Sequence, residues 1–191
     1  MRVYEVFSIV NEYQYFMIDS DYREAHRYLL DGTPKLATWE EPPVFIYKPL
    51  LKRGNFADMW GLFSPALDEH AVDELRELLE MSGELLPLTH QGENWSILNV
   101  TECVNMLDDE RSKWVYGETT GAKIQIAKYV FHASRVTESP LFKIPEMRKT
   151  QILTIEGFKD PEDEFKYRVE QAGLTGLKFK LLWSDDIEED E

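Results

Sequence analysis

Alternating hydrophobic and polar positions predict strands at both ends of the chain. Val3–Val10 and Tyr13–Ile18 alternate and are rich in β-branched and aromatic residues, which is typical of half-buried strands. Because only Asn11 and Glu12 separate them, we expect the two strands to form a hairpin. Leu177–Trp183 has the same character and predicts a final strand.

The strongest helical pattern follows Ser64. Serine is a favoured N-cap and proline suits the first helical position, so we expect a helix over Pro65–Met81 that ends at Gly83. One side of this helix is an apolar, core-facing stripe made of Leu67, Ala71, Leu75, Leu78 and Leu79. The opposite side carries the carboxylates Glu69, Asp73, Glu77 and Glu80. These carboxylates form either a solvated face or a docking face for a cation-rich partner.

The remaining elements are shorter and mix helices with strands. Helices are expected over Asp21–Leu30, over Thr101–Leu107 and from Asp160 to Ala172. Strands are expected at Val44–Lys48, Trp114–Tyr116, Lys123–Phe131, Leu141–Ile144 and Gln151–Ile155, with the second and third of these joined as a hairpin. Because strands and helices do not alternate regularly, the pattern predicts an α+β domain, with a mostly antiparallel sheet packed against three to four helices.

One domain is expected over residues 1–183. The segment 184–191 ends in DDIEEDE and is interpreted as a disordered acidic tail, since so many carboxylates cannot be buried together. The whole chain is acidic as well: 21 Lys and Arg against 36 Asp and Glu leave a net charge of −15. This balance argues against nucleic acid or an anionic membrane as the main partner and favours a basic protein.

Neither a membrane span nor a secretory leader is visible, so the protein is expected in the cytoplasm. The single cysteine, Cys103, excludes an internal disulfide and a multi-thiolate metal site, and is interpreted as a small apolar residue.

The stretch Gly83–Asp108 contains the only dense group of potentially catalytic side chains, namely Glu84, His90 and Glu93. Gly92 interrupts the spacing that a helical metal site would need, and no second histidine lies near in sequence. The other histidines, His26, His70 and His132, belong to three different expected elements. The chain also lacks a phosphate-binding loop and a nucleophile elbow. We therefore interpret this stretch as a structural seam and predict no catalytic residue, metal or cofactor.

The order of these segments resembles the immunity-eleven family of bacterial polymorphic toxin systems. The resemblance is carried by GELLPL, GENWSILNVTECVNMLD, KYVF, LFKIPE and GLTGLKFKLLW, at positions 83–88, 92–108, 128–131, 141–146 and 173–183. DGTPKLATW and GNFADM, at 31–39 and 54–59, fit the amino-terminal half of that family. The acidic segment after Trp183 lies outside the resemblance.

The resemblance implies a cytoplasmic protein that binds and neutralises a toxin encoded beside it, by stoichiometric occlusion and without catalysis. The candidate toxin-binding residues are the acidic helix face Glu69, Asp73, Glu77 and Glu80, and an acidic loop of Asp108, Asp109 and Glu110 that is expected to be exposed. Two other functions stay open: an enzyme that reverses the toxin's modification, and an acidic interaction module that acts without a toxin.

Overall fold

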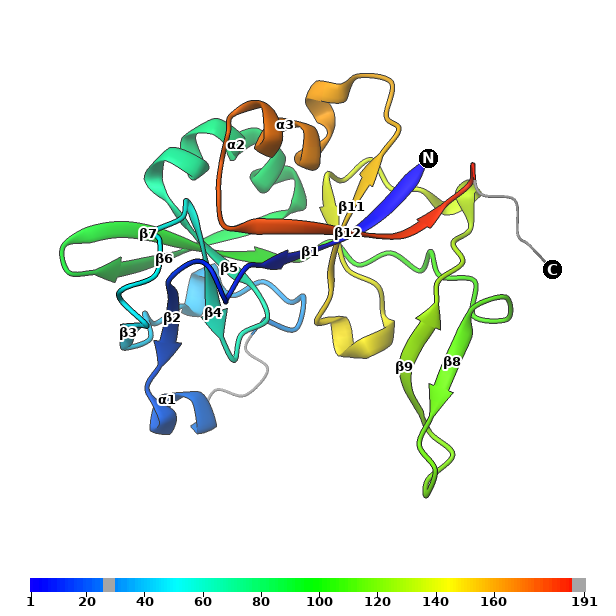
Figure 1. Cartoon of the computed structure of the whole chain (residues 1–191), viewed down its shortest axis with the longest axis horizontal. Coiled ribbons are helices and arrows are strands. Elements are labelled where there is room, and N and C mark those ends of the chain that lie inside the picture. Colours follow the sequence, from blue (N-terminus) through cyan, green and yellow to red (C-terminus); the bar gives the residue numbers. More distant parts are fainter. Residues whose placement is uncertain (26–29, 187–191) are drawn as a thin grey trace.

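Strands dominate the computed structural model, which describes residues 1–25 and 30–186 (Figure 1). The first sheet has the order β10 (Leu141–Phe142), β11 (Ile152–Glu156), β1 (Arg2–Ser8) and β12 (Leu177–Ser184). The second sheet has the order β3 (Val44–Tyr47), β2 (Tyr15–Ile18), β4 (Phe56–Trp60), β5 (Pro65–Asp68), β7 (Glu93–Val100) and β6 (Gly83–His90). A separate hairpin joins β8 (Lys113–Tyr116) to β9 (Lys123–Lys128). All pairings between these strands are antiparallel except that of β2 with β4.

Helices are few and short by comparison. Within the described residues, the α-helices are α1 (Ser20–Ala25), α2 (Glu69–Ser82) and α3 (Phe165–Gln171). The 3-10 helices are η1 (Leu36–Thr38), η2 (Ala133–Arg135), η3 (Glu146–Lys149) and η4 (Pro161–Asp163). The expected α+β domain with three to four helices is therefore wrong, because the chain is mostly β.

The expected helix over Pro65–Met81 begins four residues too early. Pro65–Asp68 form β5 instead, since Ala66 pairs with Ala57 on one side and with Ile97 on the other. Asp68 is the N-cap, and its side chain accepts a hydrogen bond of 2.9 Å from the Ala71 N–H. Gly83 ends the helix as expected. Backbone pairing of Pro65–Asp68 with a strand on each side therefore outweighs the helix-start signal of Ser64 and Pro65.

Two further helix predictions are also wrong in extent. Residues 101–107 are extended, because the Val104 N–H donates to the Lys143 carbonyl and Met106 accepts from the His132 N–H. The segment from Asp160 to Ala172 divides into η4 and α3. Of the helix predicted over Asp21–Leu30, α1 accounts for the first part, while residues 26–29 lie outside the described residues.

The predicted hairpin of the first two strands is wrong as well. β1 pairs with β11 and β12 in the first sheet, whereas β2 pairs with β3 and β4 in the second. Gly176 sits where these sheets meet: its carbonyl accepts from the Ile9 N–H at 2.9 Å. It has a φ of +105°, and a Cβ there would lie 2.1 Å from the Phe56 carbonyl oxygen. Only glycine fits that approach. By contrast, the strand at Val44, the β8–β9 hairpin and the final strand are confirmed, with shifted ends.

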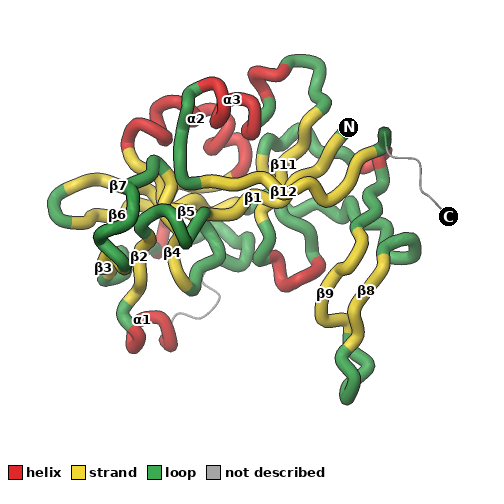
Figure 2. Tube along the Cα trace, viewed as in Figure 1, coloured by secondary structure: helices red, strands yellow, loops and turns green. Residues whose placement is uncertain are grey.

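The core consists of three apolar clusters. The first lies between the two large sheets and helices α2 and α3, and includes Val6, Phe56, Leu75 and Phe165. Figure 2 shows both helices on the same side of the strands. The second cluster contains residues of β2, β4, β5, β6 and β7. The third lies around β9 and β11. Each fully buried Leu or Phe side chain contributes about 1.5–3 kcal/mol to stability, so burial rather than helix propensity sets the fold.

Candidate functional site

The acidic face of α2 borders a groove of about 430 Å³, which we call the α2 groove. It lies between α2 and the β6–β7 hairpin and is lined by Glu69, Val72, Asp73, Arg76, Leu85, Asn94, Trp95 and Ser96. The apolar side of α2 is buried in the core, so the carboxylates are exposed, as the sequence predicted. Glu69 and Asp73 line the groove, whereas Glu77 and Glu80 lie outside its lining.

The charges in the α2 groove are only partly compensated. Arg76 Nη2 lies 3.0 Å from Asp73 Oδ1, and Arg76 Nη1 lies 3.9 Å from Glu80 Oε1. Glu69 accepts a hydrogen bond of 2.8 Å from Asn94 Nδ2. Within the described side chains, Glu69 and Glu77 form no ion pair. The groove therefore offers carboxylate oxygens that a cation can approach from solvent.

The second predicted group is not a uniformly exposed loop. Asp108 is only 7% exposed, which corrects the prediction. Its Oδ1 accepts from the Arg111 N–H at 3.0 Å, and its Oδ2 lies 3.6 Å from His132 Nδ1. Such contacts stabilise the turn before β8 and leave little of the carboxylate for a partner. Asp109 and Glu110 are exposed.

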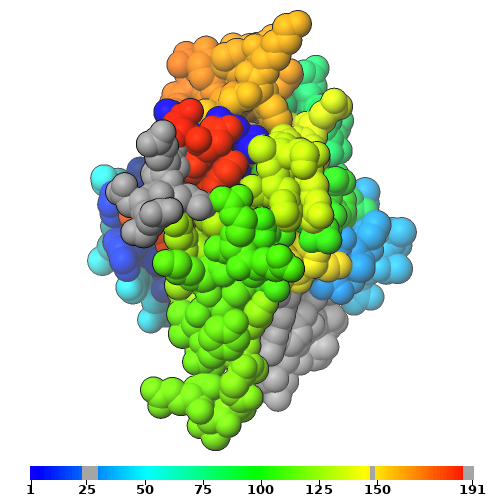
Figure 3. Space-filling view, turned by 90° about the vertical axis from the view of Figure 1, so that its right-hand side faces the viewer, coloured from blue at the N-terminus to red at the C-terminus, as the bar shows by residue number. Residues whose placement is uncertain are grey.

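Asp109 forms an ion pair with Lys123, whose Nζ also lies 4.5 Å from the centre of the Trp114 ring. This pair links the loop to β9, so only Glu110 and part of Asp109 face solvent. The β8–β9 hairpin projects from the body of the protein, and the structure places it far from α2 (Figures 1 and 3). The two predicted acidic groups therefore do not form a single surface.

In the Gly83–Asp108 stretch, Glu84, His90 and Glu93 lie on strands β6 and β7, and each contacts a neighbouring segment. Glu84 accepts from the Lys35 N–H at 2.7 Å and from Asn99 Nδ2 at 3.0 Å, which ties β6 to the segment before η1. Glu93 pairs with Arg53 at 2.9 Å, which lowers the Glu93 pKa. The His90 ring packs edge-on against Phe16. Among the described residues, no three His, Cys, Asp or Glu side chains are arranged to hold a metal.

A cleft that the sequence did not predict lies between the two large sheets, and we call it the Asp58 cleft. It has a volume of about 160 Å³ and is lined by Glu5, Val6, Phe7, Ser8, Asp58, Phe63, Ser64, Pro65, Thr150, Gln151 and Ile152. Burial raises the pKa of Asp58 to about 6, and a hydrogen bond from the Ser8 side chain only partly opposes this. An aspartate inside the apolar run FADMW was the available signal, since aspartate is depleted in strands.

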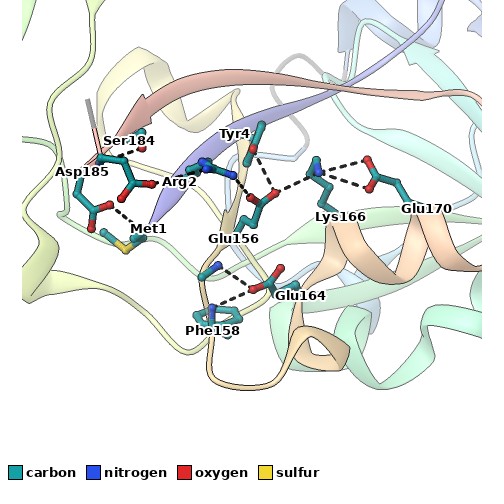
Figure 4. Close-up of polar contacts among 12 residues, drawn as sticks. Met1, Arg2, Tyr4, Glu156, Phe158, Glu164, Lys166, Glu170, Ser184 and Asp185 are labelled. Carbon is teal, nitrogen blue, oxygen red and sulfur yellow. Dashed lines mark hydrogen bonds and ion pairs between the residues drawn. The ribbon is translucent and has the colours of Figure 1, made fainter. Parts of the chain in front are cut away.

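A second polar cluster joins the two ends of the described chain and is structural (Figure 4). Glu156 accepts hydrogen bonds from Arg2 at 2.7 Å, from Tyr4 at 3.1 Å and from Lys166 at 3.1 Å. These donors lower the pKa of Glu156 despite its partial burial. The amino group of Met1 pairs with Asp185, just after β12 ends at Ser184. The predicted acidic tail thus begins within a strand, and its residues 187–191 lie outside the described residues.

Comparison with known proteins does not assign this chain to a family. No family model matches the chain, and no curated protein gives a significant match. The resemblance to the immunity-eleven family stays a prediction. In the part of the chain that the structure describes, no helix combines the length and the hydrophobicity needed to cross a bilayer.

Proposed function

We propose that this protein is a cytoplasmic immunity protein, which binds a basic bacterial toxin and neutralises it at one-to-one stoichiometry. The observation that carries the proposal is the α2 groove, a solvent-open groove of about 430 Å³ edged by the carboxylates of Glu69 and Asp73. Inhibition by occlusion needs no catalytic group. The resemblance of the Gly83–Asp108 stretch to an immunity family supports the same role.

The charge of the protein favours fast association with a basic partner. A net charge of −15 attracts a cationic protein over several ångströms, and such steering raises association rates strongly at low ionic strength. Electrostatic steering alone does not slow the dissociation of a complex much, because exposed ion pairs contribute only about 0–1 kcal/mol each. Of the apolar side chains that line the groove, Val72 and Trp95 are buried and Leu85 is half-buried, so Leu85 supplies the apolar contact area there.

The carboxylates of α2 differ in how readily a partner's cation can approach them. Arg76 sits on the same helix face as Asp73 and Glu80 and pairs with both. A partner's cation that approaches Asp73 competes with this internal guanidinium, whereas one that approaches Glu69 displaces only the amide of Asn94. We therefore expect Glu69 to contribute more to binding than Asp73 or Glu80.

The test is a titration of the purified protein against the secreted protein encoded beside it, with the toxic activity as readout. Loss of activity at a one-to-one ratio, together with a stable complex, supports occlusion. Protection at a small fraction of that ratio would instead support an enzyme that reverses the toxin's modification. Absence of both inhibition and complex formation would leave a toxin-independent interaction module.

Charge-matched variants locate the surface. Neutralising Glu69, Asp73, Glu77 and Glu80 as Gln or Asn should weaken toxin binding at least tenfold and reduce its salt dependence. A control variant should neutralise four exposed carboxylates elsewhere: Glu118, Glu138, Asp163 and Glu170. Equal effects of the two variants would indicate steering by net charge and exclude the α2 groove as the interface. A third variant with Asp109→Asn and Glu110→Gln tests the distant loop in the same way.

A further inference from the structure

The Asp58 cleft combines a partly buried carboxylate with aromatic walls. Asp58 lies on β4 and faces β1, where the side chain of Ser8 hydrogen-bonds to it. The cleft opens beside Phe7, which is 37% exposed, and Phe63, which is 59% exposed. Large apolar side chains that stay this exposed at the mouth of a cleft are typical of binding surfaces.

The turn between β4 and β5 holds Phe63 in an unfavourable backbone conformation. Phe63 has a φ of +55°, in the left-handed region that non-glycine residues rarely adopt. Its neighbours fix the turn: the Met59 N–H donates to the Ser64 carbonyl at 3.2 Å, and the Leu62 N–H donates to the Met59 carbonyl at 2.9 Å. Such a conformation costs on the order of 1–3 kcal/mol and clusters at sites where a side chain must be presented.

A second group of aromatic rings lies near Asp58, with Trp60 on its own strand β4, Tyr15 on β2 and Tyr47 on β3. The Tyr15 ring lies 6.0 Å from the Trp60 ring and 5.3 Å from the Tyr47 ring, measured between centroids. Trp60 is 46% exposed, and Asp58 acts electrostatically on the Tyr15 phenol. Tyr15 itself is buried, whereas Phe7, Phe63 and Trp60 are exposed. A carboxylate beside such exposed rings is a chemical environment that attracts organic cations.

Nothing within the described protein neutralises Asp58. Glu5, the other carboxylate of the cleft, accepts from Gln151 Nε2 at 3.0 Å. Lys180 stands opposite Glu5 in the register of β1 with β12, and Lys178 Nζ lies 5.8 Å from the Phe7 ring. Yet neither lysine, nor any other described cation, forms an ion pair with Asp58. A carboxylate buried without a counter-charge is destabilising, so its charge is available to an external cation.

We propose that the Asp58 cleft binds the guanidinium or ammonium group of a basic side chain from the protein partner, between the rings of Phe7 and Phe63. Asp58 accepts hydrogen bonds from the cation, and the aromatic faces cover the alkyl stem. The proposal rests on the proposed function for the source of that side chain, because a basic toxin presents many of them. A single desolvated arginine in such a cleft is a common hot spot of protein interfaces.

Binding through Asp58 has a defined pH dependence. The pKa of Asp58 is raised to about 6 in the free protein, so the carboxylate is mostly charged at pH 7 and mostly neutral at pH 5. Affinity for a cation should therefore fall about tenfold between these values. Glu5 also lines the cleft. Burial raises the pKa of Tyr15, which lies near Asp58, so its phenol stays neutral between pH 5 and pH 7.

The experiment is an NMR titration of the ¹⁵N-labelled full chain with N-acetyl-arginine methylamide, which needs no toxin. Saturable shifts at Ser8, Asp58 and Phe63 are expected, with N-acetyl-norleucine methylamide giving shifts at least tenfold weaker. Asp58→Asn should weaken arginine binding roughly tenfold or more, since a charge-assisted hydrogen bond is lost. The variant with Glu69→Gln and Asp73→Asn should bind the probe as the wild type does.

The outcomes separate this inference from the proposed function. Absence of shifts around Asp58, or shifts that Asp58→Asn leaves unchanged, would overturn the cation cleft even if the protein inhibits a toxin. Binding of the arginine probe through Asp58 without any effect on a toxin would support the cleft and contradict the proposed immunity role. If both hold, Asp58→Asn should also weaken the toxin complex at pH 7 and leave its affinity nearly unchanged between pH 7 and pH 5.

Discussion

Asp58→Asn should make the protein more stable at neutral pH. The folded protein holds the pKa of Asp58 at about 6, against an ordinary value of 3.8. Since each pKa unit corresponds to about 1.4 kcal/mol, the charged form of Asp58 costs roughly 3 kcal/mol in the folded state, or about 2–3 kcal/mol once its partial exposure is allowed for. Asparagine has nearly the same shape, keeps a hydrogen-bond partner for Ser8 and carries no charge.

The raised pKa of Asp58 sets the sign of the stability difference between Asp58→Asn and the wild type, and also the pH range over which this difference develops. Below about pH 3.8, Asp58 is protonated in both the folded and the unfolded chain, so the substitution changes little. As pH rises from 3.8 to 6, the unfolded chain releases its proton first, and the wild type loses stability relative to the variant. The gain of Asp58→Asn should therefore grow through this interval and level off near pH 7.

Urea unfolding followed by tryptophan fluorescence, between about pH 4 and pH 7, measures this difference in the free energy of unfolding. Glu118→Gln, which removes an exposed carboxylate in the turn of the β8–β9 hairpin, is the matched control and should change stability by less than about 0.5 kcal/mol at every pH. A difference for Asp58→Asn that is independent of pH, or that favours the wild type at pH 7, would refute the reasoning. If Asp58→Asn is more stable than the wild type but binds arginine less well, Asp58 lowers stability in exchange for binding, as expected of a functional residue.

Two further substitutions test buried charge elsewhere in the fold. Lys143 is 1% exposed, donates to the Leu30 carbonyl at 2.9 Å and has a pKa lowered to about 8 by burial, so the folded protein loses this proton before the unfolded chain does. Between pH 8 and 10.5 the wild type should therefore gain roughly 3 kcal/mol relative to Lys143→Met, and urea unfolding that shows a constant difference would contradict this. Glu156→Gln should cost about 1–2 kcal/mol at pH 7, because it removes the negative charge and one of the two oxygens that accept from Arg2, Tyr4 and Lys166. Because the pKa of Glu156 is lowered from 4.5, that cost should shrink as pH falls below 4.5; a cost that persists in strong acid would show that packing, not charge, is responsible.

Local features of this protein were predictable from the amino-acid sequence alone. Alternation over Leu177–Trp183 and over the β8–β9 hairpin predicted strands that the structure contains. The stop at Gly83 and the apolar stripe of α2 were also predictable, because caps and amphipathic spacing act within a few residues. The exposure of Glu69, Asp73, Glu77 and Glu80 followed from that stripe.

Strand pairing and the burial of individual charges depend on contacts between distant segments of the chain. Pro65–Asp68 have good helix-start signals, yet they form a strand because β4 and β7 satisfy their backbone from both sides. Asp108 belongs to an acidic run, yet Arg111 and His132 enclose it. The Asp58 cleft joins β1, β4 and β11, whose residues lie up to about 150 positions apart in the chain. Local patterns report which face of an element is buried, but not which distant element covers it, since pairing depends on the burial that the whole chain achieves at once.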